Sequence, residues 1–190
     1  PSVEVHNAAG AEMAAKHLLA GGAQRLGVIA DCREYAYTQE RLAGLRAAVA
    51  DSASVGVDIR FRQKGQDQFV AGVEAVEGWL ADGGVPEAVF AMGDVLALGA
   101  LSALNARGIA CPGAVRMVGF DGTPLAQYAS PPLSTIRQPF EEMAARAIDM
   151  VEAQLAGQPV EQPHVLLMPQ LIVRRSSDLG SPAGSSHGCV

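Results

Sequence analysis

The chain has 190 residues, of which 49% are hydrophobic, and it carries a net charge of −6 with a sequence pI near 5.1. This length suits one ordinary domain or two small lobes, and no apolar run reaches the roughly 18 residues of a membrane-spanning helix. The negative charge argues against these residues gripping a nucleic-acid backbone themselves. Cys32, Cys111 and Cys189 are odd in number and lack paired or metal-type spacing, which favours a reducing, cytoplasmic location.

The hydrophobic period switches repeatedly between strand-like runs and helical stripes, which is typical of an α/β domain with a mainly parallel sheet. The predicted elements are, in chain order, a strand at 3–5, a helix at 10–20, a buried strand at 25–30, a helix at 38–52, an edge strand at 57–63, a helix at 66–82, and then a strand at 87–92, a helix at 94–107 and a strand at 114–120. Thr38 is the expected N-cap of the second helix, and Gly108 is the expected end of the fourth. Phe69, Val73, Val76 and Leu80 are expected on the buried side of the third helix.

The regular pattern breaks after Pro131-Pro132. A short strand at 134–138 leads into a long helix at 139–156, which has a proline in its first turn, and residues 164–176 read as extended structure. The small, polar residues 177–190 are expected to form a disordered tail.

Sequence motifs for catalysis are missing. The chain contains no G-x-S-x-G elbow, no G-x-x-x-x-G-K-[ST] loop and no G-x-G-x-x-G fingerprint. Its four histidines lie far apart and lack partners at metal-ligand spacing. We therefore expect no enzyme, no metal site and no cofactor.

Polar residues follow successive strands at the edge of the predicted sheet where open parallel sheets bind ligands. Arg41 lies after the strand at 25–30, Asp67 after the next, and Gly93-Asp94 and Asp121 after the third and fourth. A cation near the positive end of a helix needs an acceptor, so Arg41 is expected to have one. These residues are the candidate ligand-binding group.

Each candidate also has a purely structural interpretation. Asp94 can cap the helix that it begins, and Asp67 can either cap its helix or contact a ligand. Arg41 can pair with a neighbouring surface glutamate, and Asp121 can form an Asx-turn. Arg41 and Asp121 are the stronger candidates, because no helix follows Asp121 directly.

Several segments together resemble the effector-binding core of the lactose-repressor/galactose-repressor family of bacterial transcription regulators. They are "NAAGAEMAAKHLLAGG", "ERLAGL", "AMGDVLALGAL", "VGFDG", "SPPLSTIRQPFEEMA" and "LLMPQLIVRRSS", and they hold their order across residues 3–176. The resemblance implies a fold like type I periplasmic binding proteins. In that fold each lobe has a doubly wound parallel sheet of flavodoxin-like order 2-1-3-4-5, and an effector is held between two lobes.

The resemblance also implies residue roles. The family's effector-contacting arginine falls on Arg41 and its aspartate on Asp121, and both suit the adjacent hydroxyls of a sugar. Asp67 falls where the family often has an aromatic group, and Gly93 falls where it usually has asparagine. The expected effector is a sugar or a related polyhydroxylated metabolite.

The family's domain plan predicts how the chain is divided. Residues 1–22 would end an N-terminal sublobe, and 23–133 would form the C-terminal sublobe. Residues 134–159 would be a hinge strand and helix of the N-terminal sublobe, and 160–176 would return to the C-terminal sublobe. The family's DNA-binding headpiece does not precede residue 1, so the chain is expected to be truncated at its N-terminus and to reach operator DNA only through that headpiece.

The helix at 94–107 predicts an interface between two copies of the chain. Its leucines spread around the helix more widely than one core-facing stripe requires, so some are expected to be exposed. Leu98, Leu101 and Tyr128 are the expected contacts of a homodimer, as the family resemblance also implies. Alternatively, the helix is sandwiched between the sheet and the helix at 139–156.

Two other classes of protein share these βα units. A periplasmic sugar-binding protein of a transport system has the same fold and would carry an export leader. A flavodoxin-like enzyme would need a catalytic group or phosphate loop that the sequence does not show.

Overall fold

The computed structural model describes residues 1–50 and 55–178. Its helices and strands are β1 (Ser2–Val5), α1 (Asn7–Leu19), β2 (Arg25–Ala30), α2 (Ala36–Val49), β3 (Gly56–Phe61), α3 (Gln68–Ala81), β4 (Ala88–Ala91), α4 (Asp94–Ala106), β5 (Arg116–Asp121), α5 (Pro124–Tyr128), β6 (Ser134–Arg137), α6 (Phe140–Leu155), β7 (His164–Leu167) and β8 (Gln170–Ile172). Among the helices in these ranges, none is long and apolar enough to cross a membrane.

A six-stranded sheet with the order β3-β2-β4-β5-β6-β8 forms the main body. The first five strands pair in parallel, and β8 pairs with β6 in antiparallel orientation. Counted from β2, the order of the parallel strands is 2-1-3-4-5, so the predicted fold class is confirmed. β3 pairs only with β2 and lies at the edge of the sheet, as its alternating sequence predicts.

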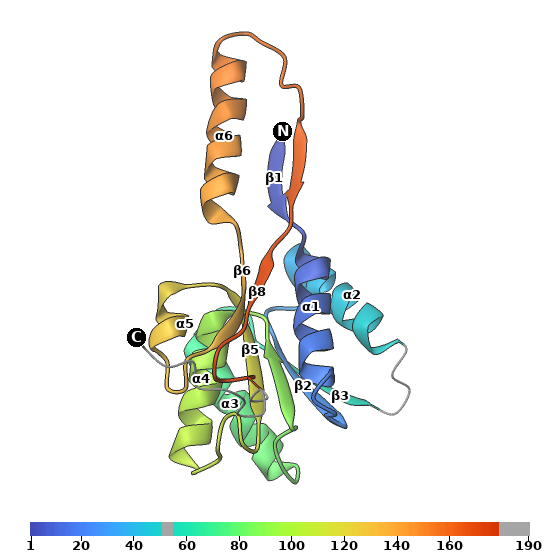
Figure 1. Ribbon diagram of the computed structural model, residues 1–190, viewed down its shortest axis with the longest axis vertical. Helices are drawn as coiled ribbons and strands as arrows, with labels where there is room; N and C mark the ends of the chain where they lie inside the picture. The colour runs from blue at the N-terminus through green and yellow to red at the C-terminus, as the bar shows by residue number, and fades with distance from the viewer. Residues whose placement is uncertain (51–54, 179–190) are drawn as a thin grey trace, which may run out of the picture.

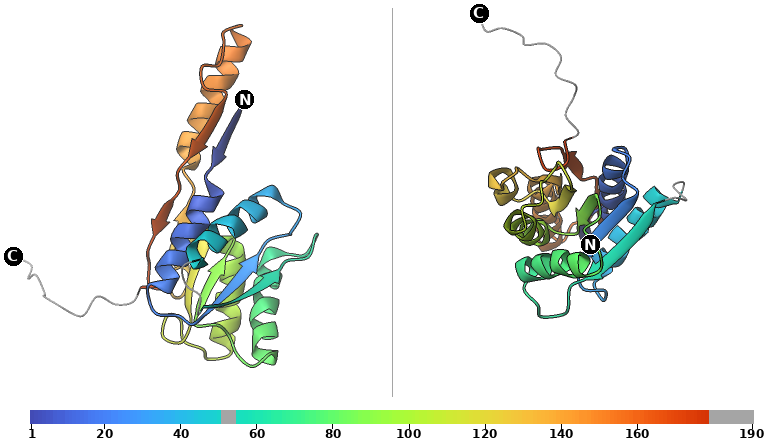
Figure 2. Two further views of the ribbon diagram at one scale, coloured as in Figure 1. Left: turned by 90° about the vertical axis from the view of Figure 1, so that its right-hand side faces the viewer. Right: turned by 90° about the horizontal axis from the view of Figure 1, so that it is seen from below.

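Two helical layers cover the sheet: α1 and α2 on one face, and α3, α4 and α5 on the other (Figure 2). The helices within each layer approach closely because glycines lie at their contacts. A Cβ on Gly44 would lie 1.9 Å from the Ala8 carbonyl oxygen, and a Cβ on Gly99 would lie 2.0 Å from that of Phe69. These backbone contacts fix the positions of α2 and α4 above the sheet.

An extension made of α6, β1 and β7 rises from the main body (Figure 1). β1 and β7 form a separate two-stranded parallel sheet, with Ser2 opposite His164 and Val5 opposite Leu167. Three chain segments link it to the body: β1 leads into α1, β6 leads towards α6, and β7 leads into β8.

The division into lobes differs from the predicted one. α1 was expected in the N-terminal sublobe, but its alanines and Leu18 pack with Leu42 and Phe90 in the core of the main body. β6 is likewise a strand of the main sheet. Ser177, expected to begin a disordered tail, is buried, while residues 179–190 of that predicted tail lie outside the described residues.

Two predicted helix features are wrong. α2 begins at Ala36 after Tyr35, so Thr38 lies inside the helix, buried, and is not its N-cap. On α3, Phe69 is 41% exposed. The buried face of α3 is made of Ala71, Gly72, Ala75, Val76 and Trp79, so Val76 is buried as predicted. Small residues form much of this face because α3 packs closely against the backbone of α4.

Candidate functional site

A pocket of about 320 Å³ opens at the carboxyl ends of β2, β4 and β5, where the main body meets the extension. It is lined by Val5, Asn7, Asp31, Tyr37, Arg41, Gln68, Met92, Asp121 and Gln138. The structure therefore brings together the two strongest candidates from the sequence, Arg41 and Asp121. It also adds Val5, Asn7 and Gln138, which come from two of the three segments that link the body to the extension.

Arg41 is buried in this pocket, with only 5% of its surface exposed. Its Nε donates to Asn7 Oδ1 at 2.9 Å, its Nη1 donates to the Met92 carbonyl at 2.7 Å, and its guanidinium lies 3.6 Å from the centroid of the Phe120 ring. Burial lowers the pKa of Arg41, and the charge of Asp121 opposes that shift. Because the side chain is buried and bonded to other partners, the surface ion-pair interpretation is wrong.

Asp121 ends β5 and turns into the pocket through an unusual backbone conformation. Its φ of 122° is in a region that non-glycine residues rarely adopt, and Gly122 follows with a φ of 75°. One carboxylate oxygen accepts from Gln138 Nε2 at 2.8 Å. Burial raises the pKa of Asp121 to about 6, although the Arg41 guanidinium acts in the opposite direction.

Asp94 holds the loop that carries Asp121. Its side chain makes no capping bond to α4 and is fully buried. Oδ2 accepts from the backbone N–H of Thr123 at 2.6 Å and from the Thr123 hydroxyl at 2.9 Å, and Oδ1 accepts from the Thr135 hydroxyl at 2.6 Å. The expected capping role is therefore wrong, because the carboxylate ties the β5–α5 loop to β6 instead.

Asp31 is a pocket residue that the sequence reasoning missed. Its Oδ1 accepts from Cys32 N–H at 2.6 Å and from Arg62 Nε at 2.7 Å, and its Oδ2 accepts from the Tyr37 hydroxyl at 2.8 Å and from Gln68 Nε2 at 3.3 Å. Burial alone would raise the pKa of Asp31, but these hydrogen bonds lower it. Asp31 directly follows β2, so the rule that selected Asp121 could have found it.

Asp67 and Gly93 do not line this pocket. Asp67 is the N-cap of α3, where its Oδ1 accepts from Val70 N–H at 3.0 Å. Gly93 occupies the N-cap position of α4, and a Cβ there would lie 3.7 Å from Asp121 Oδ2. The capping interpretation of Asp67 therefore has structural support. Gly93 lies next to the Asp121 carboxylate but outside the lining of the pocket.

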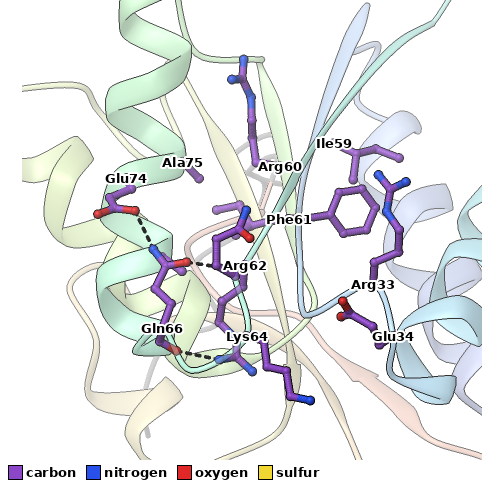
Figure 3. A pocket seen from close by; sticks show the side chains of 13 residues that line it. Arg33, Glu34, Ile59, Arg60, Phe61, Arg62, Lys64, Gln66, Glu74 and Ala75 are labelled. Atoms are coloured by element: carbon purple, nitrogen blue, oxygen red, sulfur yellow. Dashed lines mark hydrogen bonds between the residues drawn. The ribbon is translucent and has the colours of Figure 1, made fainter.

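A second pocket of about 540 Å³ surrounds the end of the edge strand β3 (Figure 3). Basic side chains line it, but several are already paired. Arg62 binds Asp31 and donates to the Gln66 carbonyl at 2.6 Å, and Arg60 contacts Asp58 at 3.1 Å and Asp82 at 2.7 Å. The Asp31–Arg62 ion pair thus lies between the two pockets. We place the candidate site in the smaller pocket, where Arg41 and Asp121 converge.

The expected dimer contacts divide into exposed and buried residues. Leu101 is only 3% exposed and packs in the core, so it is not available to a partner. Leu98 is half-buried, and Tyr128 is 78% exposed. The alternative that α6 covers α4 is also wrong, since α6 lies in the extension and α4 packs beside α3 on the main sheet.

The sequence profile of the periplasmic binding protein-like domain family matches residues 15–177. The chain belongs to this family. It is 34% identical over 177 residues to the HTH-type transcriptional repressor CytR of Escherichia coli strain K12, a match that covers 93% of this chain and 52% of the relative. The predicted resemblance to lactose-repressor/galactose-repressor regulators is thereby confirmed. Such relatives are named as repressors and not as enzymes, in agreement with the sequence.

Solved structures show the same similarity. The complex of the transcriptional regulator CelR with cellobiose matches with a TM-score of 0.82 at 30% identity, covering 92% of this chain and 53% of that one. A dimeric Lac repressor with a C-terminal deletion matches with a TM-score of 0.84 at 26% identity, covering 93% and 64%. The chain spans about half the length of the curated relatives that it matches.

Proposed function

We propose that this chain is the effector-binding part of a cytoplasmic bacterial transcriptional regulator, a repressor, whose effector is a sugar or a related polyhydroxylated metabolite. The observation that carries this proposal is the convergence of Arg41 and Asp121 in one pocket. A guanidinium donor and a carboxylate acceptor together suit adjacent hydroxyl groups. The repressor names of the relatives favour a regulator over a periplasmic transport protein. Operator DNA would be bound by a separate headpiece.

The position of the pocket suggests how an effector acts. Val5 and Asn7 lie where β1 passes into α1, and Gln138 lies between β6 and α6. An effector that contacts these residues and Arg41 together favours one orientation of the extension relative to the main body. Such a differential contact is what a ligand needs in order to shift a conformational equilibrium.

Removing either polar group tests the proposal. We expect Arg41→Met and Asp121→Asn each to weaken binding of a cognate sugar by about 1–3 kcal/mol, because each leaves a polar partner of the ligand unpaired. The assay is a calorimetric titration with the best ligand from a thermal-shift screen of neutral sugars and nucleosides. Lys64→Met is the matched control, since Lys64 lines only the second pocket. Unchanged affinity in both pocket variants would contradict the assignment.

We also propose that two copies of the chain associate through the outer face of α3, α4 and α5. Leu98 and Tyr128 remain available there from the expected interface. Phe69, Val70 and Leu125 are exposed on the neighbouring α3 and α5. Exposed apolar residues on neighbouring helices are typical of interfaces, and a two-fold dimer suits a regulator of near-palindromic operators.

Sedimentation equilibrium tests this interface. Tyr128→Glu should weaken dimerisation strongly, because it places a charge in an apolar contact. Leu166→Glu is the control, since Leu166 is a similarly exposed apolar residue on β7 of the extension. A parent chain that is monomeric, or a Tyr128→Glu chain that dimerises with parental affinity, would exclude this surface.

A further inference from the structure

The hydrogen bonds inside the pocket leave mainly acceptors facing a ligand. Gln68 Nε2 donates to Asp31 and Gln138 Nε2 donates to Asp121. Because a carboxylate can only accept, each amide must present its nitrogen to it, which leaves the amide oxygen available. The Tyr37 hydroxyl likewise donates its only proton to Asp31 and keeps its oxygen lone pairs. Three side chains thus become acceptors through their carboxylate partners.

Several side-chain donors of the pocket are already engaged within the protein. Arg41 uses Nε on Asn7 and Nη1 on the Met92 carbonyl, and Asn7 Nδ2 donates to Glu40 at 2.8 Å. Within the described residues, Arg41 Nη2 takes part in no hydrogen bond and is left as a donor for a ligand, together with the second N–H of each pocket amide. A ligand that satisfies this pocket must therefore bring several donors of its own, as hydroxyl groups do.

The charges of the pocket oppose an anionic ligand. Asp31 and Asp121 line it together with a single cation, Arg41. The second guanidinium nearby, Arg62, is held behind Asp31 and lines the other pocket (Figure 3). A phosphate group carries up to two negative charges and needs several cationic or N–H partners. This pocket offers such a group two carboxylates and part of one guanidinium.

The N-termini of α3 and α4, at this edge of the sheet, do not compensate for these charges. An uncapped N-terminus is a ready anion site, but the first turn of α3 is capped by Asp67 through Val70 N–H. At α4, Asp94 places a carboxylate in the first turn. The protein's own carboxylates therefore lie at both of these helix starts.

Tyr37 gives the pocket a flat apolar wall. Its hydroxyl is anchored on Asp31, and its ring stacks on Tyr35 with centroids 5.3 Å apart. Val5 and Met92 add aliphatic surface. The C–H face of a five- or six-membered sugar ring packs well against such a wall, while its hydroxyl edge meets the acceptors.

We propose that the pocket selects an uncharged, hydroxyl-rich ring and rejects the phosphorylated form of the same molecule, with Asp31 as the residue that sets this selectivity. The inference rests on the proposed function, because it concerns the effector of the same pocket. Asp31 acts in two ways: it holds Tyr37 and Gln68 as acceptors, and it adds a negative charge to the lining of the pocket. A free sugar and a nucleoside share this ring chemistry.

The test is an NMR titration of this chain with glucose, ribose, cellobiose and adenosine, each beside its phosphate monoester. Amide signals of Gly93 and Gly122 report on the pocket, because both residues adjoin Asp121. We expect at least one neutral compound to bind. The affinity for its phosphate ester should be lower by a factor of about ten or more, since like-charge contacts disfavour complexes strongly. Binding of a free sugar or of adenosine then shows which of the two, a sugar or a nucleoside, the pocket accepts.

Variants test the role of Asp31 separately. Asp31→Asn should bring the affinities of the neutral compound and its ester closer together. Glu34→Gln removes the same charge from a neighbouring exposed residue outside this pocket and should leave their ratio unchanged. If Asp31→Asn does not fold, the titration of the parent chain still decides the selectivity.

The possible outcomes separate the two proposals. An ester that binds as tightly as its parent compound overturns the selectivity while the effector site stands. If neither neutral compounds nor esters perturb the pocket signals, the proposed function fails and the selectivity fails with it. An unchanged ratio in a folded Asp31→Asn variant removes Asp31 as the selective residue.

Discussion

Replacing Asp94 by alanine should destabilise the chain far more than replacing the other aspartate at a helix start, Asp67. Asp94 is fully buried and accepts three hydrogen bonds. Hydrogen bonds to charged groups contribute roughly 1.5–3 kcal/mol each. The two threonine hydroxyls can rotate towards other acceptors, whereas the Thr123 N–H is fixed and would be left unpaired. Burial of the carboxylate, which raises the pKa of Asp94, offsets part of the stabilisation that these hydrogen bonds provide. We expect a net loss of about 3 kcal/mol.

Urea unfolding of the parent chain and both variants measures this difference. Asp67 is exposed and makes a single capping bond, so Asp67→Ala should cost about 1 kcal/mol. The two substitutions remove the same side chain from the start of a helix. The difference between their losses in free energy of unfolding therefore reports the effect of burial and of the number of hydrogen bonds. The urea concentration at the unfolding midpoint should fall, with little change in the slope of the unfolding free energy against urea concentration.

Equal losses in the two variants would refute this reasoning. That result would mean that the β5–α5 loop keeps its conformation without the buried carboxylate. In the expected case, the loop relaxes and Asp121 loses the backbone conformation that turns it into the pocket, so Asp94→Ala should also weaken ligand binding.

Three further predictions concern packing and ionisation. Gly99→Ala places a Cβ 2.0 Å from the Phe69 carbonyl oxygen and should lower the melting temperature strongly, whereas Gly78→Ala meets only ordinary contact at 3.5 Å and should be neutral or stabilise the helix by about 0.5 kcal/mol. Leu101→Ala should cost about 2–5 kcal/mol in urea unfolding without changing the dimer affinity, because the side chain lies in the core. The pKa of Asp121 is about 6 in the folded chain, above its ordinary 3.8, so the folded state binds more protons between these values. Its contribution to stability is therefore lost as the pH rises from about 4 to about 6, and Asp121→Asn should remove this part of the pH dependence measured by urea unfolding.

Strands were easier to predict from the sequence than the faces of helices. Segments such as 26–30 and 117–120 are continuous apolar runs, which is the pattern of strands buried on both sides. The helices α2, α3 and α4 instead pack through Gly44, Gly72 and Gly99, where backbones meet. Reasoning from large apolar side chains therefore placed Phe69 inside and Leu101 at the surface, the reverse of their positions.

The candidate site was predictable where one local rule applies. The rule that ligands bind at the carboxyl ends of parallel strands selected Arg41 and Asp121 and would have selected Asp31. It could not select Asn7 or Gln138. These residues reach the pocket only because β1 and β6 lead to the same end of the main body from distant parts of the chain.

The residues that the rule missed are the ones that connect the pocket to the rest of the molecule. Gln138 bonds the Asp121 carboxylate and lies on the segment that enters α6. Asn7 bonds Arg41 and lies directly after the strand β1 of the extension. Arg41 and Asp121 are thus each bonded to a residue of a linking segment. A movement of the extension that displaces Asn7 or Gln138 changes the contacts of Arg41 or Asp121, and a ligand that holds both side chains in turn restrains the extension, because coupling between two sites is reciprocal.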